Sequence, residues 1–157
     1  MTDGLERLWT PWRMAYVTGP AKPPGCPFCE PSEDLLVASG TLVFAVLNKF
    51  PYNPGHLLIC PYRHVPDYTD LTGEEVLELG LFTQRAMEVI RKVSSAHGFN
   101  IGMNQGDVAG AGIAGHLHQH VVPRWGGDSN FLPVVGGTKA LPQLLHDTRD
   151  LLRGAWD

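Results

Sequence analysis

The chain has 157 residues, which is the length of a single domain. Its 12 Lys+Arg and 16 Asp+Glu give a formal charge of -4, so we expect no binding to nucleic-acid polymers, which requires a basic surface. No apolar run approaches the roughly 20 residues that span a bilayer, so we expect no membrane partner. The first residues lack the apolar stretch of a secretion signal. Three cysteines in such a chain favour a reducing, cytoplasmic location over a disulfide framework.

The N-terminal part of the chain holds one apolar segment and one predicted hairpin. Residues 5–17 are rich in Trp and apolar side chains, and we expect them to pack either on a second subunit or on the protein's own core. The apolar runs Thr41–Leu47 and His56–Pro61 predict two strands. The spacer Asn48–Gly55 is rich in Pro, Asn and Gly, and it predicts a long turn that joins these strands.

One long helix is predicted to begin after Thr72, because Thr72 and Glu75 form a capping box. We expect Gly98 to end it. The apolar residues between these positions recur at helical spacing: Val76, Leu79, Phe82, Ala86, Val89, Ile90 and Val93.

The rest of the chain predicts two further strands and a second helix. The strands are Phe99–Asn104 and His116–Pro123. The final helix is Leu141–Trp156, with Pro142 in its first turn, where proline is tolerated. Strands, then a helix, then strands, joined by loops of hairpin length, predict an antiparallel α+β fold.

Histidine occupies every second position at the start of the last predicted strand: His116, His118 and His120. Side chains alternate between faces along a strand, so we expect these three imidazoles on one face. A neutral imidazole can attack phosphorus when an acceptor orients its other ring nitrogen. The glycine-rich residues 106–112 predict a loop whose backbone N–H groups can approach an anion. A metal site built from all three histidines is the main alternative.

The segment His116-Leu-His118-Gln-His120-Val-Val resembles the signature of the histidine triad (HIT) nucleotide-binding family, His-φ-His-φ-His-φ-φ with φ apolar. Asn48, the Pro54-Gly55-His56 turn, and Asn104 with its glycine-rich loop support this resemblance. Segments 8–13 and 123–131 are similar to a bacterial branch of the family that is described as diadenosine-tetraphosphate phosphorylase-like or hydrolase-like.

The resemblance implies a five-stranded antiparallel sheet with one long helix and a C-terminal helix, and a homodimer in which two sheets join. We expect one HIT domain over residues 1–157, with an N-terminal extension (1–25) and a C-terminal extension (125–157). The implied activity is nucleotidyl transfer or hydrolysis at the α-phosphate of adenine nucleotide conjugates, most simply dinucleoside polyphosphates. The resemblance does not decide between phosphorolysis and hydrolysis. The alternative is a slow or inactive nucleotide-binding protein that is stabilised by zinc.

The resemblance also assigns roles to residues. His118 is expected to be the nucleophile that forms a nucleotidyl-histidine intermediate, His120 to contact phosphate oxygens and assist the leaving group, and His56 to orient the triad. The residues implied in contacts to ribose, phosphate and base are Asn48, Asn104, Gly110, Ala111, Gly112, His116, Phe28, Phe44 and Leu47. For the last three, a place in the core is the alternative.

One departure from the family pattern lies just before the triad. Family members commonly carry a Ser or Thr hydroxyl there that binds phosphate, whereas residues 111–115 of this chain have none. Either backbone N–H groups bind the phosphate alone, or the leaving group differs. This departure favours the non-enzymatic alternative.

A second candidate site starts from Cys26 and Cys29. A Cys-x2-Cys pair in a reducing environment indicates either half of a zinc site or a redox pair. Glu30-Pro31-Ser32 follows directly, and this does not favour the helix that a redox pair usually opens. His64 and His116 can supply the remaining ligands of a four-coordinate zinc. Several histidine triad relatives, and the related uridylyltransferases, bind zinc through this pattern, so we expect a structural Zn²⁺ at these four residues.

Overall fold

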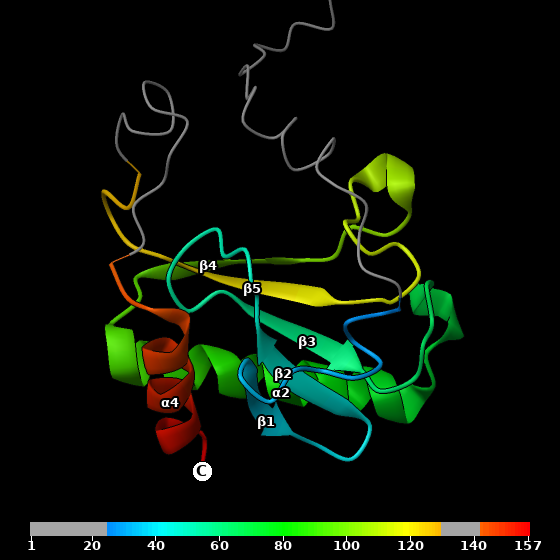
Figure 1. Ribbon diagram of the computed structural model, residues 1–157, viewed down its shortest axis with the longest axis horizontal. Helices are drawn as coiled ribbons and strands as arrows, with labels where there is room; N and C mark the ends of the chain where they lie inside the picture. Colours follow the sequence, from blue (N-terminus) through cyan, green and yellow to red (C-terminus); the bar gives the residue numbers. More distant parts are fainter. Residues whose placement is uncertain (1–24, 130–141) are drawn as a thin grey trace, which may run out of the picture. The chain divides into compact units, whose positions relative to one another are not determined.

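A five-stranded antiparallel sheet organises the protein (Figure 1), in a computed structural model that describes residues 25–129 and 142–157. The strand order is β1-β2-β3-β5-β4, which confirms the expected α+β fold. The strands are β1 (Leu36–Ser39), β2 (Val43–Leu47), β3 (Leu57–Pro61), β4 (Gly98–Gly102) and β5 (Gln119–Arg124). Two short 3-10 turns, η1 (Tyr68–Asp70) and η2 (Asp107–Ala109), lie in the connections. Segment 5–17, and residues 130 and 131 of the stretch 123–131, lie outside the described residues.

Helix α2 (Gly73–Ser94) covers one face of the sheet. The predicted capping box is confirmed, because the Thr72 side chain accepts the Glu75 N–H and the Glu75 side chain accepts the Thr72 N–H. The predicted end at Gly98 is wrong. The helix ends at Ser94, and the capping residue Ser95 takes a left-handed conformation with φ 52° and donates its N–H to the Arg91 carbonyl. Gly98 instead opens β4.

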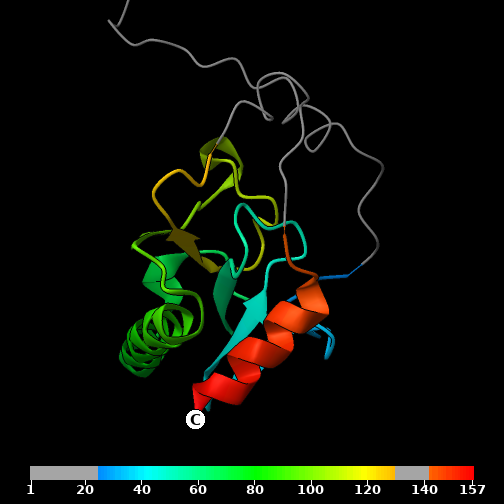
Figure 2. The ribbon, with the colours of Figure 1, turned by 90° about the vertical axis from the view of Figure 1, so that its left-hand side faces the viewer.

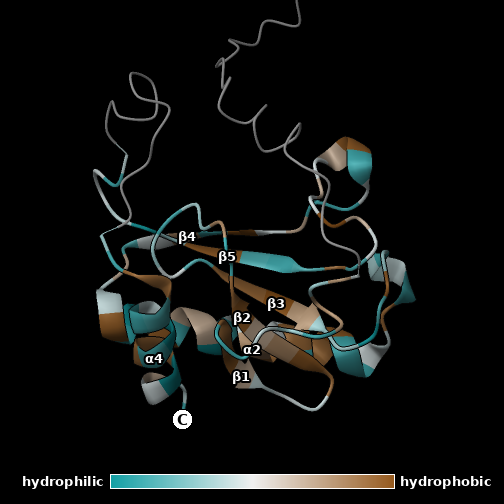
Figure 3. Cartoon of the chain, in the orientation of Figure 1, coloured by the Kyte–Doolittle hydropathy of each residue, from teal (hydrophilic) through white to brown (hydrophobic). Residues whose placement is uncertain are grey.

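Alternation along β2 divides the core into two clusters on opposite faces of the sheet. Val43, Ala45 and Leu47 belong to the larger cluster, which includes the buried side chains of α2. Phe44 and Val46 belong to a smaller cluster with side chains from β3 and from the loop around Cys26 and Phe28. Strands β2 and β3 are accordingly apolar throughout, whereas β5 begins with hydrophilic residues (Figure 3).

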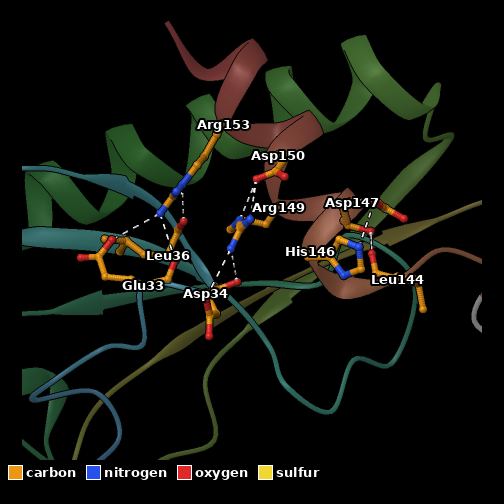
Figure 4. Close-up of polar contacts among 10 residues, drawn as sticks. Glu33, Asp34, Leu36, Leu144, His146, Asp147, Arg149, Asp150 and Arg153 are labelled. Atoms are coloured by element: carbon orange, nitrogen blue, oxygen red, sulfur yellow. Dashed lines mark hydrogen bonds and ion pairs between the residues drawn. The ribbon is translucent and has the colours of Figure 1, made fainter.

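Helix α4 (Leu145–Trp156) packs against α2 and β1. The two helices cross rather than run parallel (Figures 1 and 2), and Phe82 of α2 contacts the Trp156 ring at 5.6 Å. Two arginines of α4 donate to main-chain carbonyls at the sheet edge (Figure 4): Arg153 Nε to Leu36 at 2.6 Å, and Arg149 Nη1 to Asp34 at 3.0 Å. These contacts cover an edge strand that would otherwise offer unpaired backbone groups.

Several predicted boundaries differ from the structure. α4 begins at Leu145, so Pro142 precedes the helix instead of lying in its first turn. β1 has only four residues and a register shift, and no run in the sequence predicted it. β5 begins at Gln119, so His116 and His118 belong to the segment that enters the strand. Among the described residues, no helix is long and apolar enough to cross a membrane.

Candidate active site and metal site

His118 has one ring nitrogen fixed by the backbone. Its Nδ1 lies 2.8 Å from the carbonyl oxygen of His116. A carbonyl can only accept, so Nδ1 of His118 carries the proton and Nε2 keeps its lone pair. The side chain is 7% exposed, and burial lowers its pKa below the ordinary value. At neutral pH, His118 is therefore a neutral imidazole with an oriented Nε2 lone pair, which is the form that attacks phosphorus.

His56 and His120 form a hydrogen-bonded pair with defined tautomers. The Tyr52 main-chain N–H donates to His56 Nδ1 at 3.0 Å, so the proton of a neutral His56 is on Nε2. His56 Nε2 lies 2.9 Å from His120 Nδ1 and donates to it. His120 consequently keeps its own proton on Nε2. Burial, and then the neighbouring His118, lower the pKa of His120 to about 4, so it is a neutral N–H donor at pH 7.

The three rings of the site lie side by side. The centroids of His118 and His120 are 5.2 Å apart, and those of His56 and His120 are 5.1 Å apart. His56 is fully buried, so its orientation is set by the protein and not by solvent. The expected grouping of His56, His118 and His120 is thus present in the structure.

The three apolar residues that were expected to contact the nucleotide base lie on two different faces of the sheet. Phe28 is 8% exposed, and its ring contacts those of His118 at 5.0 Å and His116 at 5.6 Å. Phe44 lies in the same cluster as Phe28 but is fully buried. Leu47 lies in the core on the α2 side of the sheet. The structure therefore does not bring Leu47 together with Phe28 and Phe44.

Asn48 lies beside the histidine pair. Its Nδ2 is 3.4 Å from His56 Nδ1, and its Oδ1 accepts the Phe50 N–H at 2.9 Å. The side chain is half-buried, at the end of β2. It therefore supports the loop that leads to His56.

The glycine-rich loop uses some of its backbone donors internally. Gly110, in a left-handed conformation with φ 83°, donates its N–H to the Asp107 carbonyl at 3.0 Å. Ala111 donates to the Gly106 carbonyl at 3.4 Å. These two expected phosphate donors would have to exchange partners to bind an anion. Asn104 follows β4 as a partly buried residue instead of lying within the strand.

The four predicted metal ligands lie together. The ligand atoms of Cys26, Cys29, His64 and His116 are all within 4.8 Å of one another. His116 Nε2 is 2.8 Å from the Pro61 carbonyl, so its proton is on Nε2 and the Nδ1 lone pair faces Cys26 Sγ at 3.3 Å. His64 Nδ1 lies 3.2 Å from Cys29 Sγ. Two thiols and two imidazoles at such separations form a Cys2His2 group that fits a tetrahedral metal ion.

The sequence did not predict the hydrogen bonds through which Asn53, Arg124 and Asp128 support the site. Asn53 is 2% exposed, and its Nδ2 donates to the Pro123 carbonyl and to Asp128 Oδ2, both at 2.8 Å. Arg124, the last residue of β5, donates two hydrogen bonds to Asp128 and one to Asn100. This arginine holds the pKa of Asp128 well below its usual range.

A second supporting contact comes from the opposite face of β5. Gln119 Nε2 donates to Thr83 Oγ1 at 2.6 Å, and Thr83 Oγ1 donates to the Leu79 carbonyl at 2.7 Å. The pair links the strand that carries His120 to α2. The sequence indicates this contact only through the polar residue Gln119, which lies between His118 and His120.

The fold and the paired histidine tautomers define a histidine triad protein, and comparison with known proteins agrees. The family model for the HIT domain matches residues 31–127, more than half of the chain, so the chain belongs to the HIT domain family. A protein of Mycobacterium tuberculosis (strain H37Rv) named AP-4-A phosphorylase is 53% identical over 167 residues, covering 98% of this chain and 86% of that protein. A bis(5'-nucleosyl)-tetraphosphatase [asymmetrical] of Schizosaccharomyces pombe is 41% identical over 80 residues, covering 51% of this chain and 43% of that protein.

Solved structures agree with this assignment. The crystal structure of a Zn-bound histidine triad family protein from Mycobacterium smegmatis matches with a TM-score of 0.68 and 29% identity. The match covers 83% of this chain and 92% of that one. The family resemblance seen in the sequence is confirmed.

Proposed function

We propose that this protein is a nucleotidyl hydrolase or transferase that acts on the α-phosphate of dinucleoside polyphosphates such as diadenosine tetraphosphate. The observation that carries the proposal is the hydrogen bond from His118 Nδ1–H to the His116 carbonyl, which leaves Nε2 as an oriented nucleophile. The names of the 53% and 41% identical relatives support this substrate class.

The reaction divides into two displacements at one phosphorus atom. The Nε2 lone pair of His118 forms a bond to the α-phosphorus, and the bond to the leaving polyphosphate oxygen breaks. The His116 carbonyl stabilises the charge that develops on the ring, through the Nδ1–H bond. His120 donates a hydrogen bond from its Nε2–H to the phosphoryl oxygens or to the leaving oxygen, and it keeps this proton, so the polyphosphate leaves as its anion. Water or inorganic phosphate then attacks the same phosphorus and releases His118 with AMP or ADP respectively.

We infer the remaining site roles from the same arrangement. Ribose hydroxyls would lie near Asn48, and phosphates near Asn104, the backbone of 110–112 and the triad. Phe28 is the expected residue to meet the base, because it contacts His118 and retains some exposure. Phe44 is fully buried in the same cluster as Phe28, so it can support Phe28 but cannot contact the base itself. Leu47 is not part of this proposal, because it lies in the core on the α2 side.

The Cys2His2 group is proposed to bind zinc. When bound, the ion would supply structural cross-linking of the loop at Cys26 and Cys29 to His64 and His116, not chemistry at the phosphate. The geometry of the four side chains and the Zn-bound relative support this assignment. We also propose a cytoplasmic homodimer, and a single domain over residues 1–157 with extensions at 1–25 and 125–157.

The test is turnover of diadenosine tetraphosphate with and without inorganic phosphate, with product analysis. ADP and ATP that appear only with phosphate indicate phosphorolysis, whereas AMP and ATP without it indicate hydrolysis. His118→Ala should abolish turnover. The matched control is His146→Ala, because His146 is an exposed histidine on α4.

A slow nucleotide-binding protein is the second candidate, because residues 111–115 lack a hydroxyl and two loop amides already have partners. Turnover by wild type that is no faster than by His118→Ala, together with measurable binding of the nucleotide, would favour this candidate over the enzyme.

A further inference from the structure

Tyr52 contacts both members of the His56–His120 pair, and the proposed roles of the site residues do not include it. Its main-chain N–H donates to His56 Nδ1 at 3.0 Å. Its ring lies 4.8 Å from the His56 ring and 5.9 Å from the His120 ring, and it is parallel to His120 within 8°. One residue thus provides the hydrogen bond that fixes the tautomer of His56 and an aromatic surface against His120.

The position of Tyr52 is set by its neighbour Asn53. The Asn53 carbonyl accepts the His56 N–H at 3.1 Å, and its side chain donates to the Pro123 carbonyl of β5. Because His120 lies on the same strand, Asn53 joins the loop to the strand on which the Tyr52 ring packs. Tyr52 is 50% exposed, so its ring lies at the surface beside the His120 ring instead of in the core.

We propose that Tyr52 is a positioning residue of the site: its amide and its ring together hold the His56–His120 pair in the tautomer and orientation that present His120 Nε2–H to the substrate. The amide fixes the tautomer and the aromatic ring fixes the orientation, and the hydroxyl is not required. The kinetic consequence of this inference rests on the proposed function, but the effect on His120 itself does not.

The surroundings of His120 make the effect measurable. Within residues 25–129 and 142–157, the titratable groups that contact its ring are His56 from the loop before β3, His118 from its own segment, and Tyr52. Leu58 of β3 and Gly102 of β4 pair with it in the sheet and carry no charge. Burial is the main cause that lowers the pKa of His120, so removal of the ring should raise that pKa.

The experiment compares wild type with Tyr52→Phe and Tyr52→Ala by NMR titration of the His120 ring, assigned by its loss in His120→Asn. We expect the same His120 pKa in wild type and Tyr52→Phe, and an increase of at least one unit in Tyr52→Ala. Phe50→Ala, at a neighbouring side chain that is 62% exposed, is the matched control and should leave it unchanged. If Tyr52→Ala does not fold, Tyr52→Leu replaces it, with an expected rise of the same sign.

Kinetics provide the second measurement. The acid limb of kcat/KM in Tyr52→Ala should move to higher pH by the same amount as the His120 pKa, while Tyr52→Phe retains the wild-type profile. An unchanged His120 pKa in Tyr52→Ala overturns the inference. Loss of activity in Tyr52→Phe also overturns it, because the hydroxyl would then be the acting group. Absence of turnover in wild type contradicts the proposed function alone, since the NMR result stands independently.

Discussion

His116 and His118 are joined through the backbone: the carbonyl oxygen of His116 accepts the Nδ1–H of His118 at 2.8 Å. The ring of the same His116 directs Nδ1 at Cys26 Sγ, and its Nε2–H is bound to the Pro61 carbonyl. The residue that orients the proposed nucleophile is therefore also a candidate metal ligand. A shift of the His116 backbone moves both the ring and the carbonyl that fixes the His118 tautomer.

Removal of one thiol should consequently affect both sites. We expect Cys29→Ser to lose bound zinc, to lower Tm by roughly 5 °C, and to reduce kcat because the His116 carbonyl is no longer held. Zinc content by elemental analysis, thermal melting and turnover measure the three effects. Cys60→Ala is the matched control: this buried thiol lies in the smaller cluster and is no ligand, so stability should fall while zinc stays. Equal zinc content in Cys29→Ser and wild type would contradict the prediction.

Asn53 should be the most sensitive polar residue of the loop before β3. It is 2% exposed and donates to both the Pro123 carbonyl and Asp128. Asn53→Ala removes the hydrogen bond to the Pro123 carbonyl and one of the hydrogen bonds to Asp128, which keeps those from Arg124, so we expect a loss of about 2–3 kcal/mol in the free energy of unfolding. Urea denaturation measures it. Asn100→Ala, which removes an exposed acceptor of Arg124, should cost less than about 0.5 kcal/mol, and similar losses in both variants would refute the assignment.

Local sequence patterns, formed by residues a few positions apart, predicted much of this structure. The start of α2 follows from Thr72 and Glu75, which lie three residues apart and satisfy each other's backbone N–H groups. Cys26 and Cys29 suggested a metal site because the chemistry of thiols restricts their uses. In both cases the signal is local or chemically specific.

Contacts between distant segments were not predictable in this way. β1 is too short for a period-two pattern, and it is held by β2 and by the arginines of α4, which lie more than 100 residues away. Tyr52 lies in the spacer Asn48–Gly55, whose composition predicted a turn but gave no role to any single side chain in it. Its role depends on how the loop packs against β5, and Leu47 could not be assigned to a face before the register of β2 was known.

Arg153 should stabilise the edge of the sheet. Its Nε donates to the Leu36 carbonyl at 2.6 Å, and its Nη2 donates to the Glu33 carbonyl at 3.1 Å (Figure 4). Arg153→Ala removes both bonds, and we expect it to lower the free energy of unfolding by about 1–2 kcal/mol. Arg153→Lys, which cannot donate to two carbonyls in the same planar geometry, should recover less than half of that loss. Full recovery by lysine would show that charge, and not the two hydrogen bonds, is what matters.

Gly40 and Gly80 should respond in opposite directions to the same substitution. A Cβ at Gly40 would lie 2.7 Å from Glu78 Oε1 and from the Phe82 ring, and this Glu78 carboxylate accepts the N–H groups of Thr41 and Val43. Gly40→Ala should therefore destabilise the protein by about 1–3 kcal/mol. Gly80 lies inside α2 with nothing within 4 Å of its added Cβ, so Gly80→Ala should stabilise by about 0.5–1 kcal/mol. Paired urea denaturation curves measure both, and two changes of the same sign would contradict this account.

The buried histidines should make the protein less stable as the pH falls below 7. The folded-state pKa of His120 is about 4, below the ordinary value near 6.5. The unfolded chain therefore binds more protons between these values, so the stabilising contribution of neutral His120 is complete above pH 6.5 and is lost as the pH falls toward 4. From pH 7 to pH 5 we expect a loss of about 2 kcal/mol from this residue.

Other titratable groups also contribute to the pH dependence of the free energy of unfolding, each with a defined sign. Burial lowers the pKa of His116 and His118 too, so both add to the loss of stability. Glu75 has a pKa lowered to about 2, chiefly by its hydrogen bond from Arg63, so its contribution is lost only at lower pH. Urea denaturation at pH 7 and pH 5 measures the dependence, and His120→Asn should reduce it. A free energy of unfolding that is equal at both pH values, or an undiminished slope in His120→Asn, would contradict the assignment of this pH dependence to His120.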